Sequence, residues 1–257
     1  MTLFRQLVIS RIYFYDFCDM LRLLNQIRQE MRQRASAKKA RHLQRFFKTG
    51  PGEYAEGDIF LGVAVPQTRA IIKKYWREIS IKETEILLHN KIHEERLAAL
   101  LILVKKFEKG DEPSRKEIFN LYLANAKFVN NWDLVDLSAP KIIGAYLEDK
   151  DKNILLNLAE SKNLWERRIA MLAVFLFIKN GDAAMALKIA EILISDKEDL
   201  IRKSVGWMLR EIGKNCGQKI EEDFLRRHYR IMSRTTLRYA IERFDEDTRQ
   251  TYLTGRI

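Results

Sequence analysis

Apolar and polar positions follow a helical period along most of the chain. From about residue 80 onward a short pattern recurs, in which a basic residue precedes a run of mostly apolar or small residues. Four copies carry it: Arg96-Leu97-Ala98-Ala99-Leu100, Arg168-Ile169-Ala170-Met171-Leu172, Lys203-Ser204-Val205-Gly206-Trp207 and Arg238-Tyr239-Ala240-Ile241. Glycine-containing turns at Gly110, Gly181 and Gly217 separate these segments. The pattern therefore predicts a series of helix pairs.

The spacing of these copies indicates how the helix pairs are arranged. Arg96 and Arg168 are 72 residues apart, the next two intervals are 35 residues each, and Asp133 lies near the middle of the longest interval. A period of roughly 35–40 residues with two helices per unit is typical of HEAT-like repeats. We therefore expect an all-α, HEAT-like helical-repeat solenoid. Such a stack is curved, and its concave face collects the same helix position from every repeat.

The first part of the chain departs from this pattern. Residues 20–45 predict one amphipathic helix, with an apolar stripe that includes Leu24, Ile27 and Met31 and a strongly basic opposite face. Residues 46–66 hold four of the eleven glycines and predict the main loop. We expect residues 1–19 to be an N-terminal extension or an extra helix, and residues 20–257 to form a single HEAT-like repeat domain.

The stretch from Asn130 to Pro140 has the strongest candidate chemistry. Asn130 or Asn131 can cap a helix there, and Pro140 ends or kinks it. Trp132 and Asp136 are four residues apart and share one face of that helix. An aromatic ring beside a carboxylate suits a site at which positive charge develops. The alternative is structural, with Trp132 in the core and Asp136 paired with a neighbouring arginine.

Two residues of later repeats belong with this pair. Arg168 lies 36 residues after Trp132, and Trp207 lies 39 residues after Arg168. These intervals match the repeat period, so Trp132, Asp136, Arg168 and Trp207 are expected to meet on the concave face. For Arg168 the structural alternative is an ion pair between repeats, and for Trp207 it is core packing.

The charge distribution narrows the class of partner. The chain carries 46 Lys and Arg against 35 Asp and Glu, a net charge of +11. The excess is concentrated at the ends: residues 1–50 have a net charge of +8 and residues 201–257 of +5. Such a distribution favours a polyanionic partner, above all nucleic acid, so the concave face is expected to be basic and to bind DNA. The side chains expected to contact DNA are Arg45, Lys48, Arg167, Lys203, Arg210, Arg234 and Arg238.

Cysteine usage and hydropathy indicate the compartment. Cys18 and Cys216 are the only cysteines, which excludes a disulfide framework. Charged residues interrupt the apolar opening of the chain, so residues 1–20 predict neither a signal peptide nor a membrane span. We expect a cytoplasmic monomer that does not bind membranes.

Four motifs together resemble the AlkD-type DNA alkylation-repair glycosylases, a HEAT-like repeat family. The motifs are Gly57-Asp58-Ile59-Phe60-Leu61-Gly62-Val63, Trp132-Asp133-Leu134-Val135-Asp136, Leu164-Trp165-Glu166-Arg167-Arg168 and Val205-Gly206-Trp207-Met208-Leu209-Arg210-Glu211. The resemblance covers about residue 25 to the C-terminus. It implies that Asp136 is the catalytic aspartate, that Trp132 and Trp207 are the cleft tryptophans, and that Arg168 is the cleft arginine.

The resemblance also implies an activity. The family hydrolyses the N-glycosidic bond of purines that carry positive charge from N3 or N7 alkylation, as monofunctional enzymes of base excision repair. No metal and no cofactor is required, and the partner is double-stranded DNA with alkylated bases. Arg168 is expected to hold a phosphate beside the lesion. Two alternatives stay open: a non-catalytic HEAT-repeat protein that binds DNA structures, and a protein-binding scaffold.

Overall fold

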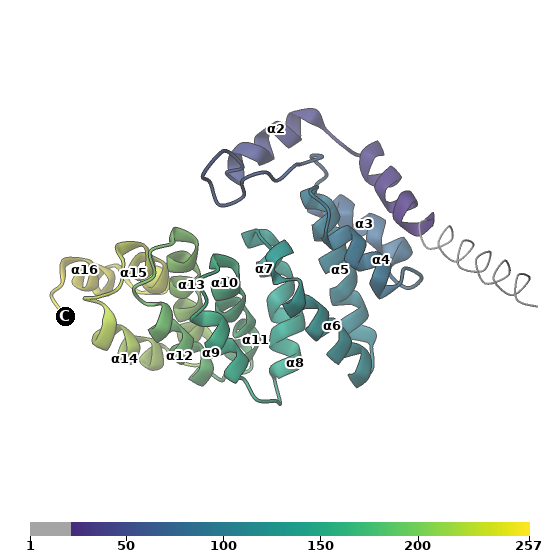
Figure 1. Ribbon diagram of the computed structural model, residues 1–257. Coiled ribbons are helices and arrows are strands. Elements are labelled where there is room, and N and C mark those ends of the chain that lie inside the picture. Colours follow the sequence, from purple (N-terminus) through teal and green to yellow (C-terminus); the bar gives the residue numbers. More distant parts are fainter. Residues whose placement is uncertain (1–21) are drawn as a thin grey trace, which may run out of the picture. The chain divides into compact units, whose positions relative to one another are not determined.

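The computed structural model describes residues 22–257, which are helical and contain no strand apart from an isolated bridge between Ile59 and Ile92 (Figure 1). The predicted all-α helical-repeat fold is confirmed. The chain divides into two compact units, up to Ile118 and from Phe119. Residues 1–19, predicted to be an N-terminal extension or an extra helix, lie outside the described residues.

The first unit begins with the predicted amphipathic helix, which is in fact two helices. Residues 22–33 form one helix, and a second helix, α2, begins at Ala37. The break occurs because Ser36 caps α2 and donates its backbone N–H to the carbonyl of Leu61, 2.9 Å away. The predicted single helix over residues 20–45 is therefore wrong at this point: a contact with a distant loop ends it. The helices of this unit are α2 (Ala37–Phe46), α3 (Val65–Tyr75), α4 (Ile81–Leu88), α5 (His93–Lys109) and the start of α6 (Glu112–Ala124).

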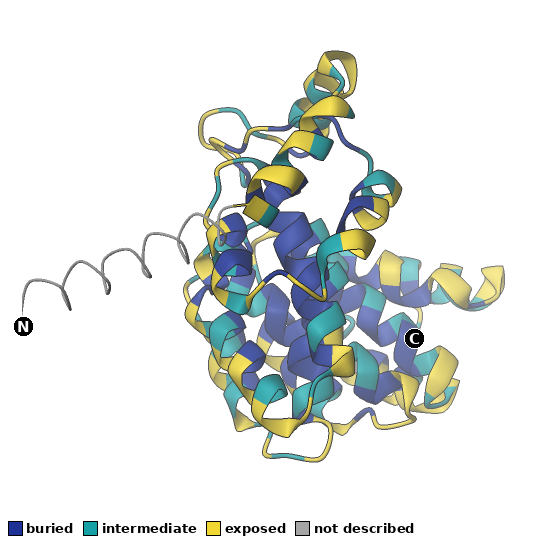
Figure 2. Cartoon of the chain, turned by 90° about the vertical axis from the view of Figure 1, so that its right-hand side faces the viewer, coloured by how far each residue is buried: buried dark blue, intermediate teal, exposed yellow. Residues whose placement is uncertain are grey.

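The glycine-containing loop between α2 and α3 is fastened to α5 by buried carboxylates. Glu94 accepts backbone hydrogen bonds from Gly62 at 2.8 Å and from Val63 at 3.2 Å. Asp58 pairs with Arg96 at 2.7 Å, and both side chains are buried. Each buried charge therefore has a partner, which limits the desolvation cost. α2 itself has no buried residue (Figure 2), and its basic residues Lys38, Lys39, Arg41 and Arg45 are exposed.

The second unit consists of short helices packed in two rows. In one row α7, α10, α13 and α15 pack successively against one another, and in the other α9, α12 and α14 pack against α10 and α13. Its elements are η1 (Ala126–Phe128), α7 (Trp132–Ala139), the π-helix η2 (Pro140–Gly144), α8 (Ala145–Leu147), α9 (Asn153–Ala159), α10 (Leu164–Ala173), α11 (Phe175–Lys179), α12 (Ala184–Leu193), α13 (Asp199–Asn215), α14 (Gln218–His228), α15 (Arg234–Ala240), η3 (Ile241–Arg243) and α16 (Glu246–Thr254). Apolar residues of both rows are buried, including Ile169 and Val205 in the first row and Ile189 and Phe224 in the second.

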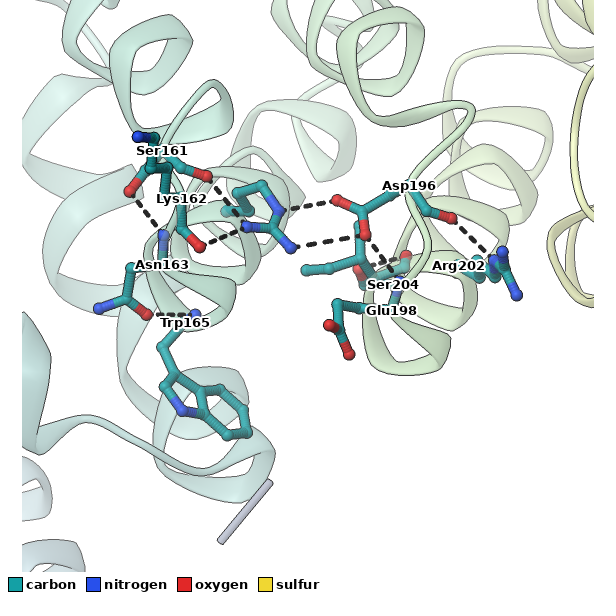
Figure 3. A network of polar contacts seen from close by, with 10 residues as sticks. Ser161, Lys162, Asn163, Trp165, Asp196, Glu198, Arg202 and Ser204 are labelled. Atoms are coloured by element: carbon teal, nitrogen blue, oxygen red, sulfur yellow. Dashed lines mark hydrogen bonds and ion pairs between the residues drawn. The ribbon is translucent and has the colours of Figure 1, made fainter. Parts of the chain in front are cut away.

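A recurring polar clamp marks the start of three of the repeat helices. In each, a residue two positions before the helix cap accepts the cap's backbone N–H, and an arginine six residues later donates to that residue's carbonyl. The three pairs are Asn90 with Arg96, Ser161 with Arg167, and Asp196 with Arg202. Figure 3 shows the two later clamps around Ser161 and Asp196.

This clamp corrects the predicted register of the repeats. The sequence pattern aligned Arg96 with Arg168 and Lys203, whereas the structure aligns Arg96 with Arg167 and Arg202. The sequence pattern aligned the wrong residue because two basic residues are adjacent in both helices, Arg167-Arg168 and Arg202-Lys203. Adjacent residues on a helix point about 100° apart. Arg167, which belongs to the clamp, therefore points in a different direction from Arg168.

Candidate active site

Helix α7 positions the first two candidate residues. Asn131 is its N-cap, as expected, although its side chain makes no capping hydrogen bond, and Pro140 follows its last residue. The chain continues beyond α7 as a π-helix, a rare form that is frequent at functional sites. Trp132 and Asp136 are the first and fifth residues of α7 and share one face, as the sequence predicts. Both are partly exposed.

Asp136 is joined to Arg168 by a two-bond ion pair. Arg168 Nε lies 2.9 Å from Asp136 Oδ1, and Arg168 Nη2 lies 2.8 Å from Asp136 Oδ2. The remaining guanidinium nitrogen, Nη1, donates to the backbone carbonyl of Leu200 in α13 at 2.5 Å. Arg168 thus links three successive helices of one row, α7, α10 and α13. The alternative in which Asp136 pairs with a neighbouring arginine describes its contacts correctly.

Burial of Asp136 opposes its ionisation, whereas the positive charge of Arg168 favours it. Burial raises the pKa of Asp136 above its ordinary value, the guanidinium of Arg168 lowers it, and the negative charge of Asp133 raises it further. The net shift of the pKa is upward. Because both bonds from Arg168 go to the carboxylate oxygens, this arginine is the main support of the charged form.

A buried chain of hydroxyl groups holds α7 from its other side. Tyr122, fully buried at the end of α6, lies 2.9 Å from Ser138 Oγ, and Ser138 Oγ donates to the carbonyl of Leu134 at 2.5 Å. Burial raises the pKa of the Tyr122 hydroxyl, which therefore stays protonated. The turn of α7 that carries Asp136 is thereby fixed between α6 and α10. The sequence gives no signal for this contact.

Trp207 is the ninth residue of α13 and is partly exposed. Its ring packs against Phe175, with ring centroids 5.7 Å apart. Gly206 precedes it and lets α15 approach closely, since a Cβ at this glycine would lie 2.5 Å from the carbonyl oxygen of Thr236. The sequence singled out Trp207 but not Phe175.

The four candidate residues lie at different positions along their helices. Asp136 and Arg168 are both the fifth residue of their helices, together with Lys203 in α13 and Arg238 in α15. We call these four residues the fifth-position row. Trp132 lies one turn before the row and Trp207 one turn after it. The catalytic roles of Trp132, Asp136, Arg168 and Trp207 stay predictions.

Some of the side chains predicted to contact DNA are exposed, and others are already bonded to groups of the protein. Arg45, Lys48 and Arg238 are exposed. Lys203 pairs with Asp199 at 2.8 Å, Arg210 pairs with Glu242, and Arg234 donates to the carbonyl of Leu253 at 2.8 Å. Arg45 and Lys48 belong to the first unit and the others to the second.

Arg167 has a clear structural role. Its Nε lies 2.7 Å from Asp196 Oδ2, and its Nη1 donates to the carbonyls of Ser161 and Lys162 at 2.9 and 3.0 Å. These bonds join α10 to the turn before α13, so the guanidinium is occupied by the fold. Binding of DNA by Arg167 stays a prediction that would need these bonds to change.

Neither metal ligands nor membrane spans stand out in the described part of the chain. Within residues 22–257 no three His, Cys, Asp or Glu side chains are grouped as a metal site. Every helix in that range is too short or too polar to span a bilayer.

These features define the class of protein: an all-helical repeat protein with a partly buried carboxylate–guanidinium pair between successive helices. Comparison with known families then gives the family. The model of the DNA alkylation repair enzyme family matches residues 27–244, and the chain belongs to that family. The expected relation to alkylation repair is thereby confirmed.

A solved structure has the same fold. It is described as a predicted DNA alkylation repair enzyme from Enterococcus faecalis, and it superposes with a TM-score of 0.65 at 16% sequence identity. The match covers 83% of this chain and 98% of that one. A search of the curated proteins gives no match.

Proposed function

We propose that the protein is a monofunctional DNA glycosylase of base excision repair, which hydrolyses the N-glycosidic bond of N3- or N7-alkylated purines in duplex DNA. The observation that carries the proposal is the Asp136–Arg168 pair, which places an oriented carboxylate one turn from Trp132 on the same helix face. Membership of a DNA alkylation repair enzyme family supports alkylated DNA as the substrate.

The proposed reaction requires mainly electrostatic stabilisation from the protein. An alkylated purine of this kind already carries positive charge, so the C1′–N bond breaks with its electron pair passing to the base, and no strong general acid is needed. Positive charge then develops on the sugar. A carboxylate at Asp136 stabilises that charge, and water adds to C1′ and loses a proton. The products are a neutral alkylated base and an abasic site.

Arg168 has a different part in this proposal from the one the sequence suggested. Its three bonded nitrogens face Asp136 and Leu200, so it orients the carboxylate and favours its ionised form in a partly buried site. It is a positioning residue, and the phosphates are left to exposed cations such as Arg238. Trp132 and Trp207 offer partly exposed rings against the deoxyribose and the neighbouring base.

The test is release of free base. Purified protein is incubated with duplex DNA that carries 7-methylguanine, and free 7-methylguanine is measured by chromatography beside an unmodified duplex. Release above the spontaneous rate supports the glycosylase.

A second candidate is a non-catalytic relative that binds DNA. The observation in its favour is that both oxygens of Asp136 are already bonded to Arg168, as in a structural ion pair. Tight DNA binding without base release would favour this candidate and overturn the glycosylase.

A further inference from the structure

A second charge pair lies on the face of α13 that carries Trp207. Asp199 Oδ2 and Lys203 Nζ are 2.8 Å apart, and the side chains are 58% and 42% exposed. Asp199, Lys203 and Trp207 are the first, fifth and ninth residues of α13, so they follow one another along one face. The pair therefore belongs to the surface of the candidate site.

The position of Asp199 is unusual among its equivalents. Lys203 belongs to the fifth-position row, between Arg168 in α10 and Arg238 in α15. The first residues of these helices are Leu164, Asp199 and Arg234, so Asp199 is the acidic one among them. Its neighbour Leu200 accepts the hydrogen bond from Arg168 at 2.5 Å, which places Asp199 beside the Asp136–Arg168 pair.

An exposed pair of this kind is easily exchanged. Ion pairs four residues apart on a helix surface are weak in water, whereas a DNA phosphate that replaces the carboxylate also releases a counterion. Lys203 can therefore leave Asp199 for a phosphate. The carboxylate left behind repels the same phosphate, so the exchange has a cost for every duplex.

We propose that Asp199 is an internal competitor for DNA phosphate at Lys203, and that it lowers the affinity of the protein for all duplex DNA, damaged or not. The inference rests on the proposed function, because it requires DNA to lie along this face. Its effect is to weaken sequence-independent binding, so that discrimination depends on the lesion contacts of Asp136 and the tryptophans.

The test compares Asp199→Asn with a matched control on unmodified duplex DNA. Asp223→Asn makes the same charge change in another exposed Lys–Asp pair, Lys219 and Asp223 of α14, 3.3 Å apart. Asp199→Asn is expected to raise affinity about threefold or more at low salt, because one repulsive charge is removed. It is also expected to steepen the plot of log K against log salt by up to about 0.9, because Lys203, which Asp199 retains in part of the wild-type complexes, then contacts a phosphate in all of them.

A double variant separates Lys203 from a general charge effect. In Asp199→Asn/Lys203→Gln the additional salt slope is expected to disappear, while Asp223→Asn keeps the wild-type slope. Equal slopes for Asp199→Asn and Asp223→Asn would overturn the inference while leaving the proposed function standing. A wild-type protein that does not bind duplex DNA would instead overturn the proposed function. Melting curves for each variant detect any change from the loss of Asp199 at the N-terminus of α13.

Discussion

Arg168 holds both carboxylate oxygens of Asp136, with its Nε 2.9 Å from Oδ1 and its Nη2 2.8 Å from Oδ2. The two residues are 32 positions apart and come from successive helices of one row. The pair orients the carboxylate that shares a helix face with Trp132, and the proposed chemistry depends on this relationship.

Removal of the charge of Asp136 should impair base release and spare binding. Asp136→Asn keeps the shape but stabilises developing positive charge poorly, so the single-turnover rate is expected to fall roughly 10²–10³-fold. DNA affinity should stay the same or rise, because a negative charge is lost. Asp133→Asn, in the same turn, is the control and should change the rate little. A normal rate for Asp136→Asn with a crippled Asp133→Asn would show that the assignment is wrong.

Removal of Arg168 should move the acidic limb of the pH–rate profile. Burial already raises the pKa of Asp136, and Arg168 lowers it. Without the guanidinium the carboxyl group protonates at a higher pH, so the rate should begin to fall at a higher pH as the solution is acidified. For Arg168→Gln we therefore expect a shift of the acidic limb toward higher pH. Arg168→Lys, which keeps a charge, should shift the limb less.

Arg167→Gln is the matched control for that experiment. It removes the adjacent arginine, which pairs with Asp196 at 2.7 Å and holds two carbonyls. Its loss should lower the melting temperature without moving the acidic limb. A shift of the limb in both variants would show that Arg168 acts only through stability.

Glu221 should make the protein less stable as the pH rises. Burial, with a contribution from Glu222, raises the pKa of Glu221 from 4.5 to about 8. Its Oε1 is buried without a hydrogen-bond partner. The unfolded chain ionises this group at the lower pH, so the free energy of unfolding should decrease from about pH 5 until it levels off above pH 8. Urea denaturation at several pH values between about 5 and 9 measures this free energy of unfolding.

Glu221→Gln should remove most of that slope and be the more stable protein at pH 8, because glutamine carries no charge to desolvate. Asp223→Asn, an exposed neighbour on α14, should keep the wild-type slope. A wild-type curve that is flat over this range would contradict the assignment.

Gly206→Ala should separate α13 from α15. The new Cβ would lie 2.5 Å from both the Thr236 carbonyl oxygen and Tyr239 Cβ, so the helices must move apart. The expected cost is about 1–3 kcal/mol of stability. Because Trp207 is the next residue, its fluorescence should also change. An unchanged melting temperature and spectrum would mean that the two helices pack less closely than the structure shows.

Removal of residues 1–19 should leave base release intact. The motifs of the candidate site begin after this segment, and the family match begins at residue 27. The measurement is the single-turnover rate of the truncated protein beside that of the full chain. A loss of soluble, active protein would show that the segment is needed.

The sequence by itself determined the helical class, the repeat period and the faces of the helices. These depend on local spacing: Trp132 and Asp136 share a face because four residues make about one turn, whatever packs against them. The spacing of the repeats also singled out Arg168 and Trp207, although they occupy the fifth position of α10 and the ninth position of α13.

The tertiary structure decided the partners. The helix predicted over residues 20–45 breaks at Ser36 because a loop residue, Leu61, accepts its N–H. Of two adjacent arginines, Arg167 clamps a turn and Arg168 reaches Asp136, although their side chains are chemically identical. Such choices depend on distances between residues far apart in the chain, and so does the burial that raises the pKa of Asp136. Local periodicity contains neither quantity, because both arise only when the helices pack.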